Sequence, residues 1–374
     1  MIIGKTKIEL IMLSLGIFIS VISQVGPLME IMRPIMFSVW IFILVSFGIF
    51  NFHNIKLSNF SLSFIFIYVG YLIYCFLKSF YDPIYYDSNF IMVLLPPLLI
   101  TVIGDFYKPA ASYDDVQKLM VVFIISALLY AVYVQITYFT SLYDWMGNRV
   151  YAFSSKNSAA QIWGCATILI FTLLKFKNKL IQLGFYFIAG YLVLLCMLSQ
   201  CRTAILGMSL ACAWFMIKNK KYRILLLLAA LIVLLIILLN WDSFSIYFNK
   251  VMFLGAEDDL DANKLSSGRI GYYEDAIQQF STNPLLGVGP YYVDDHYLCV
   301  LTDSGILGTI LIESIWLKRI FLNFKYEGKA NISLFLTSIT LFYCVESLFE
   351  AYPPFGPGVC ALVFWLSSQL LRNY

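Results

Sequence analysis

The sequence has few charged residues. Only 13% of its 374 residues are charged, 61% are hydrophobic, and the mean hydropathy is +0.81. Soluble domains average about 25% charged residues and roughly 45–50% apolar residues. This composition excludes a chain built from ordinary soluble domains and indicates an integral membrane protein.

Histidine is also scarce, and the cysteines show no disulfide pattern. The two histidines, His53 and His296, have no companion ligands at metal-binding spacing. The eight cysteines lie within or at the edges of apolar stretches, so we predict no disulfide. We therefore expect no metal and no other cofactor. The net charge of +3 forms no basic patch, so we expect no nucleic-acid partner.

Long apolar stretches fill most of the chain. A bilayer core of about 30 Å requires about 20 apolar residues per helix. Stretches of this kind lie near residues 8–25, 34–51, 60–80, 89–104, 118–140, 159–174, 181–199, 202–217, 223–240, 297–317, 331–350 and 354–371. We predict an all-α polytopic membrane protein with about 12 transmembrane helices, which form a single transmembrane domain over residues 1–374.

The positive charges predict the orientation, because Lys and Arg concentrate in short cytoplasmic loops. Clusters at 175–179, 218–223 and 318–329 fall on one side of the predicted bundle, together with both ends of the chain. We therefore expect cytoplasmic N- and C-termini. The loop 241–296, between the ninth and tenth predicted spans, then faces outward.

That loop is the one long polar stretch of the sequence. It begins with acidic residues around 257–261. In the segment 267–280, Tyr273, Ala276, Ile277 and Phe280 follow the spacing i, i+3, i+4, i+7 of a short amphipathic helix. A turn-rich segment, 283–290, follows. Chemistry in water is expected in this loop.

Two arginines stand out against this apolar background. Arg202 lies between two apolar stretches with no loop to hold it in water, and a charge at membrane depth usually marks a site; alternatively, it extends to the interface. Arg269 begins the segment predicted as a helix, where a cation opposes the helix macrodipole; alternatively, it pairs with Glu274 or Asp275. Guanidinium groups match the geometry of phosphates.

Four short motifs, in this order, resemble the O-antigen polymerase and O-antigen ligase superfamily. They are Ser199-Gln-Cys-Arg-Thr-Ala204, Ser267-Gly-Arg269, Asn283-Pro-Leu-Leu-Gly-Val-Gly289, and Asp294-Asp-His-Tyr-Leu298 followed by Gly305-Ile-Leu-Gly308. In addition, Tyr151-Ala-Phe-Ser-Ser-Lys-Asn157 is similar to the family's loop before a central span. The resemblance extends over residues 150–320.

The resemblance implies a membrane glycosyltransferase of the C-type architecture, with short helices in its outer loop. Such an enzyme takes a glycan from a polyprenyl (undecaprenyl) diphosphate carrier at the outer, periplasmic face of the bacterial inner membrane. It implies further that Arg202 and Arg269 bind the diphosphate. His296, Asp294 and Asp295 are the candidate proton acceptors, and Asp303 is a candidate for lining the cavity.

The pair Asp294-Asp295 favours the polymerase branch. The ligase branch has a His-Asn pair at this place, whereas the polymerase branch often has an Asp-Asn-type pair. A polymerase transfers the growing glycan to the sugar hydroxyl of another lipid-linked repeat unit, as in lipopolysaccharide biosynthesis. The expected partners of such an enzyme also include the membrane lipid and a chain-length regulator protein. One alternative is an O-antigen ligase that transfers glycan to lipid A core. The other is a lipid-linked oligosaccharide flippase, although transporters usually have related halves and broken helices near the midplane.

Overall fold

The computed structural model describes residues 2–52, 56–81, 89–107, 112–138, 156–199, 201–219, 269–356 and 359–373. Several sequence-based predictions lie outside these residues. They are the span 223–240, the part of the outer loop before residue 269, the motif residues before 156, and any role of His53.

The described residues form twelve α-helices and no strand. The helices are α1 (Ile2–Ile22), α2 (Met29–Phe50), α3 (Asn59–Tyr81), α4 (Asn89–Tyr107), α5 (Tyr113–Tyr138), α7 (Lys156–Thr172), α8 (Lys179–Leu198), α9 (Arg202–Lys218), α13 (Arg269–Thr282), α14 (His296–Phe324), α15 (Ala330–Ser347) and α16 (Val359–Leu370). Short 3-10 helices lie at Gly26–Leu28 and Leu371–Asn373.

Seven of the described helical segments are long and apolar enough to cross a membrane. They are Gly26–Phe50, Asn59–Tyr81, Phe90–Tyr107, Tyr113–Tyr138, Lys179–Leu198, His296–Phe324 and Ala330–Ser347. The chain is therefore an all-α multi-pass membrane protein, as predicted. The number of about 12 spans stays a prediction.

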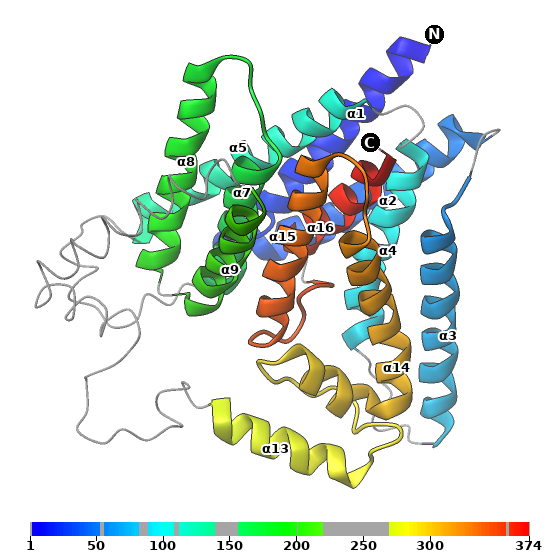
Figure 1. Cartoon of the computed structure of the whole chain (residues 1–374). Coiled ribbons are helices and arrows are strands. Elements are labelled where there is room, and N and C mark those ends of the chain that lie inside the picture. Colours follow the sequence, from blue (N-terminus) through cyan, green and yellow to red (C-terminus); the bar gives the residue numbers. More distant parts are fainter. Residues whose placement is uncertain are drawn as a thin grey trace, which may run out of the picture.

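The helices form one bundle with distinct ends (Figure 1). Both termini lie toward the upper end in this view, and α13 lies at the lower end. Large apolar side chains are exposed on the outer faces of α3 and α8, among them Phe66, Phe80, Leu180 and Phe187. Such apolar outer faces are suited to contact with lipid tails.

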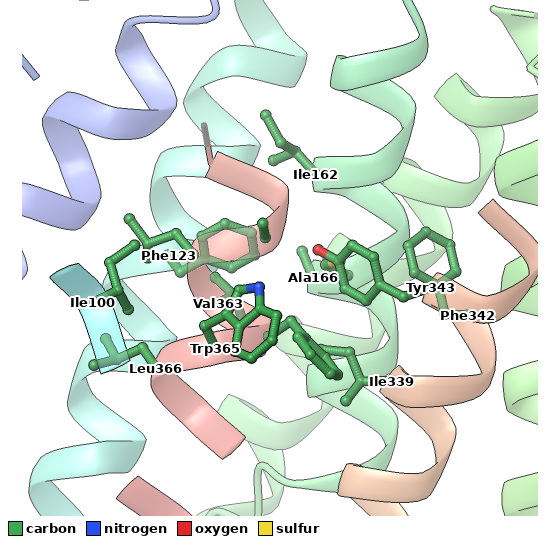
Figure 2. Close-up of a cluster of buried hydrophobic side chains, with 14 of the residues drawn as sticks. Ile100, Phe123, Ile162, Ala166, Ile339, Phe342, Tyr343, Val363, Trp365 and Leu366 are labelled. Carbon is green, nitrogen blue, oxygen red and sulfur yellow. The ribbon is translucent and has the colours of Figure 1, made fainter. Parts of the chain in front are cut away.

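The short C-terminal helix α16 is the centre of the bundle. Its residues from Ala361 to Leu370 are all buried, which is the pattern of a helix that is surrounded by others. Figure 2 shows Trp365 of α16 among side chains from α4, α5, α7 and α15, including Ile100, Phe123, Ala166 and Tyr343.

Helix α14 is interrupted at Gly305. This residue has φ 60° and ψ −172°, which is not helical, and Figure 1 shows the two parts of α14 meeting at an angle. The predicted span 297–317 lies within the candidate membrane-spanning segment His296–Phe324, but its helix is not continuous. The second part, 306–324, is about 28 Å long at 1.5 Å per residue, close to the bilayer core of about 30 Å.

The motif segment 283–289 holds this interruption in place. The Val288 amide donates to the Thr302 carbonyl (2.8 Å), and the Ile306 amide donates to the Pro284 carbonyl (2.9 Å). The hydroxyl of Tyr74 on α3 donates to the carbonyls of Leu286 and Ser304, each at 2.7 Å. The segment therefore has a structural role, since it satisfies backbone groups that the broken helix leaves without helical partners.

Two glycines meet at this contact. Gly287 has φ 72° and Gly305 has φ 60°, a region that L side chains rarely adopt. A Cβ on Gly287 would lie 2.4 Å from the Asp303 carbonyl oxygen, and a Cβ on Gly305 would lie 2.4 Å from the Gly287 nitrogen. No larger residue fits at either position without moving the backbone.

We expect Gly287→Ala and Gly305→Ala each to destabilise the fold by more than about 2 kcal/mol, from left-handed strain and backbone overlap. Thermal unfolding of the detergent-solubilised protein measures this. The matched control is Gly184→Ala in α8, where an added Cβ meets nothing within 4 Å and helix propensity improves. Equal melting temperatures for all three variants would show that the contact is not needed.

Candidate active site

Arg202 and Arg269, far apart in the sequence, line one pocket. Arg202 is the first residue of α9 and Arg269 is the first residue of α13. The pocket has a volume of about 230 Å³ and is lined by Arg202, Thr203, Leu206, Arg269, Tyr273 and Phe349. The structure thus brings together the two arginines that the sequence analysis singled out.

The pocket concentrates positive potential. Arg202 lies at the N-terminal end of α9, where the helix macrodipole is also positive, and Arg269 is the first described residue of α13. The two guanidinium groups also repel one another. Like charges gathered in this way suit an anion with more than one negative charge.

The two aromatic side chains of the pocket make different contacts: Phe349 lies near Arg269, and Tyr273 binds the backbone of Asp294. The guanidinium carbon of Arg269 lies 5.9 Å from the centre of the Phe349 ring, within the range of cation–π attraction. The Tyr273 hydroxyl donates to the Asp294 carbonyl (3.0 Å). Tyr273 therefore joins α13 to the loop that precedes α14.

Two carboxylates flank Arg269. Its Nη2 atom lies 3.6 Å from Asp294 Oδ2 and 3.7 Å from Glu350 Oε1. Both distances exceed those of direct charge-assisted hydrogen bonds, about 2.7–2.9 Å, so the carboxylates orient the guanidinium without the tight, bidentate pairing that would occupy it. Glu274 and Asp275, the partners considered from sequence, do not form ion pairs with it in the described residues.

Glu350 is a site residue that the sequence analysis did not assign to the site. It follows the end of α15, and its Oε1 accepts a hydrogen bond from Asn157 Nδ2 (2.7 Å). Burial raises the pKa of Glu350 to about 7, and the charge of Asp294 raises it too, whereas Arg269 and Asn157 lower it. One turn earlier, the buried Glu346 accepts from Gln161 Nε2 (2.8 Å). In the sequence, Glu346 and Glu350 are four residues apart, a spacing that would put both carboxyls on one face of a predicted helix. This spacing could have indicated that Glu350 belongs to a polar site.

The three predicted proton acceptors lie in different surroundings. Asp294 has 33% of its side chain exposed, contacts Arg269, and accepts from the Tyr292 hydroxyl (2.9 Å). Asp295 is the N-cap of α14 and accepts from the Leu298 amide (2.8 Å), and burial raises its pKa. His296 is completely buried. The side chain of Asp294 forms an ion pair with Arg269, which lines the pocket.

The buried His296 has a hydrogen-bond contact at Nδ1 and a carboxylate close to Nε2. Its Nδ1 lies 2.9 Å from the Ala351 carbonyl oxygen, and its Nε2 lies 3.1 Å from Glu313 Oε1. The rings of Phe90, Tyr297 and Phe355 surround it. His296 does not belong to the pocket lining.

Asp303 lies at the interruption of α14 rather than in the pocket lining. It is 1% exposed, its Oδ1 accepts from Ser304 Oγ (3.0 Å), and its backbone carbonyl accepts from Lys78 Nζ (3.0 Å). These contacts connect the broken helix to α3. A direct role of Asp303 toward substrate stays a prediction.

The described side chains show the state of the cysteines and of potential metal ligands. Seven cysteines are free thiols, at positions 75, 165, 196, 201, 212, 299 and 344. Within the described ranges, no group of three or more His, Cys, Asp or Glu side chains is arranged to hold a metal ion.

A family comparison agrees with the motifs. Residues 187–312 match the Wzy_C family, described as O-Antigen ligase. The matched segment includes Arg202, Arg269, Asp294 and the interruption at Gly305. The resemblance seen in the sequence is thereby confirmed. No curated protein matches the chain.

We expect the stability of the protein to depend on pH through Glu350. Its pKa is raised from 4.5 to about 7 on folding, so the folded state binds more protons than the unfolded state in this window, and wild-type stability falls as pH rises through it. Glu350→Gln removes this slope. Melting temperatures between about pH 5 and about pH 8 should therefore favour the variant increasingly at higher pH, whereas the exposed Glu274→Gln should parallel wild type. A constant offset for Glu350→Gln would contradict the assignment.

Proposed function

We propose, because residues 187–312 belong to the O-antigen ligase and polymerase family, that this membrane protein polymerises lipid-linked polysaccharide repeat units. Members of this family are membrane glycosyltransferases that act on lipid-linked glycans. In the proposal, the growing glycan passes from its polyprenyl diphosphate carrier to the sugar hydroxyl of another lipid-linked repeat unit.

The pocket shared by Arg202 and Arg269 is the observation that carries the proposal. Its volume of about 230 Å³ lies below the roughly 300–1,000 Å³ of sites that enclose drug-sized ligands, so it suits a charged head group better than a whole oligosaccharide. Two guanidinium groups supply planar pairs of donors for phosphate oxygens. We assign the pocket to the carrier diphosphate.

The diphosphate is the leaving group of the reaction. As the acceptor oxygen forms a bond to the anomeric carbon, the bond between that carbon and the diphosphate oxygen breaks, and negative charge grows on the diphosphate. Donors that are already in place for this charge lower the barrier. The two arginines supply the stabilisation, so the proposal requires no metal ion.

The proton of the acceptor hydroxyl passes to a carboxylate. Asp294 is the strongest of the predicted acceptors, because it is partly exposed and contacts Arg269 (3.6 Å), beside the place assigned to the leaving group. Asp295 is engaged as the cap of α14, and His296 is enclosed. A proton acceptor must come within hydrogen-bond reach of the hydroxyl, which favours Asp294.

Both reactants are lipid-anchored in this scheme. The membrane confines them to one plane, which reduces the entropic cost of bringing them together. In Figure 1, α13 lies at the end of the bundle away from both termini; with cytoplasmic termini, as the positive charges predict, the pocket faces the periplasmic side of the inner membrane. The pair Asp294-Asp295 supports the polymerase branch over the ligase branch.

The direct test is to incubate purified protein with a lipid-linked repeat unit and a chelator, and to separate the products by chain length. We expect a ladder of lengthened carriers, and we expect Arg202→Ala and Arg269→Ala each to reduce its rate by about 100-fold, as is typical when a charge-stabilising donor is lost. The control is Lys118→Ala, which removes an exposed cation on α5 that pairs with Asp115 and should leave the rate unchanged. A ladder unaffected by either arginine variant would reject the diphosphate site.

Other products would point to other functions. A single transfer onto lipid A core would assign the protein to the ligase branch. Movement of unchanged lipid-linked substrate across a liposome, with no new glycosidic bond, would assign it to transport.

Asp294→Asn is expected to reduce the transfer rate by about 100-fold or more, because the amide cannot take the proton. Its affinity for the donor should change far less. The matched control is Asp275→Asn on the exposed face of α13, which should leave the rate unchanged. If Asp294→Asn polymerises at the wild-type rate, the proton goes to another group.

A further inference from the structure

The buried pair His296–Glu313 has no role in the proposed reaction. His296 is 0% exposed and Glu313 is 9% exposed. Burying two ionisable groups costs free energy unless they satisfy each other. The contacts of the pair should therefore explain why two ionisable groups are buried here.

The contacts of His296 fix the positions of its protons. A backbone carbonyl can only accept a hydrogen bond, so Nδ1, at 2.9 Å from the Ala351 oxygen, carries a hydrogen and donates it. At the other nitrogen, Nε2 lies 3.1 Å from Glu313 Oε1. This is a close contact between a ring nitrogen and a carboxylate, although the two atoms do not have the geometry of a hydrogen bond. Because the side chain is completely buried, neither nitrogen is exposed to a substrate.

The pair connects three separate parts of the chain. Glu313 lies on the part of α14 after Gly305, His296 lies on the part before it, and Ala351 lies in the segment between α15 and α16. The same segment receives two more buried donors, since Ser347 Oγ donates to the Pro353 carbonyl and Trp365 Nε1 donates to the Pro354 carbonyl, each at 2.9 Å. The segment that follows Glu350 is therefore held from several sides.

Glu350 immediately precedes the carbonyl that His296 holds. Its carboxylate oxygen Oε1 lies 3.7 Å from Arg269 Nη2, and Asn157 Nδ2 donates a hydrogen bond to the same oxygen at 2.7 Å. A continuous series of contacts thus runs from Glu313 through His296 and the residues 350–351 to Arg269, which lines the pocket.

We propose that the His296–Glu313 pair positions Glu350 through the Ala351 carbonyl, and thereby sets the position of Arg269 for the carrier diphosphate. His296 is on this view a positioning residue rather than the proton acceptor. The inference rests on the proposed function, because it assumes that Arg269 binds the diphosphate.

Arg269 depends on such support. It begins α13, where the macrodipole opposes its charge, and its like-charged neighbour Arg202 repels it. Only the carboxylates Asp294 and Glu350 pair with it among the described residues. A shift of the Glu350 carboxylate by about 1 Å would change where the guanidinium rests, and binding groups displaced by that amount lose much of their effect.

The test compares His296→Ala with His296→Asn in the detergent-solubilised full-length protein. The Asn amide nitrogen can occupy nearly the position of Nδ1 and can donate to the Ala351 carbonyl, whereas Ala cannot. The probe is undecaprenyl diphosphate without sugar, and its dissociation constant is measured by titration calorimetry in the presence of a chelator. Polymer formation is measured in parallel.

We expect His296→Ala to weaken binding of undecaprenyl diphosphate by about tenfold, roughly the effect of a lost buried hydrogen bond, and His296→Asn to restore most of the affinity and of the polymer formation. If His296 is instead the proton acceptor, both variants bind the probe as wild type does and both fail to polymerise, which would overturn the inference. Equal loss of affinity in both variants would also overturn it, because the donor to Ala351 would then be irrelevant.

Two controls separate this inference from general destabilisation and from the proposed function. Ser368→Ala removes a comparable buried hydrogen bond, from Asn323 Nδ2 at 3.0 Å, at a contact between α14 and α16, and it should leave probe affinity unchanged. Glu313→Gln keeps a partner for Nε2 and should bind more tightly than Glu313→Ala. If Arg269→Ala binds the probe as wild type does, the proposed function fails; if that variant loses binding while His296→Ala does not, only the positioning inference fails.

Discussion

The repulsion between two guanidinium groups in one pocket is the constraint on which the site depends. Arg202 and Arg269 line the same pocket as the first described residues of α9 and α13, so the helix macrodipoles add to the positive potential instead of offsetting it. Asp294 and Glu350 offset part of this charge at distances too long for tight pairing. A free-energy gain remains for an anion that enters the pocket, as the proposed binding of a carrier diphosphate requires.

The irregular part of the fold serves this arrangement. The interruption at Gly305 lets the first part of α14 leave the bundle axis, and the segment 283–289 satisfies the backbone at that point. The loop before α14, which carries Asp294, then lies beside Arg269. The segment after α15, which is distant in the sequence, places Glu350 beside the same arginine. The pocket is therefore assembled from α9, α13 and the end of α15, with α14 as the support.

The sequence predicted the features that follow from local periodicity and from charge. The helix at α13 followed from the spacing of Tyr273, Ala276 and Phe280, and the two arginines stood out because a cation in an apolar stretch is costly. The interruption of α14 was missed because residues 297–317, although they include Asp303 and Glu313, are apolar enough on average to be predicted as one span. The dihedral angles of Gly305 and its long-range contact with Gly287 show the break. The same limit hid Glu350, since its place beside Arg269 depends on how α15 packs, and it hid the burial of His296, whose side chain turns inward toward Glu313.

The most direct test of the central claim is a double-mutant cycle on the affinity for undecaprenyl diphosphate, with Arg202→Ala, Arg269→Ala and the double variant in the presence of a chelator. If both arginines bind the same diphosphate, the two losses are coupled and the double variant departs from additivity by more than about 0.5 kcal/mol. Independent, additive losses, or no loss from one of the two substitutions, would contradict a shared diphosphate pocket.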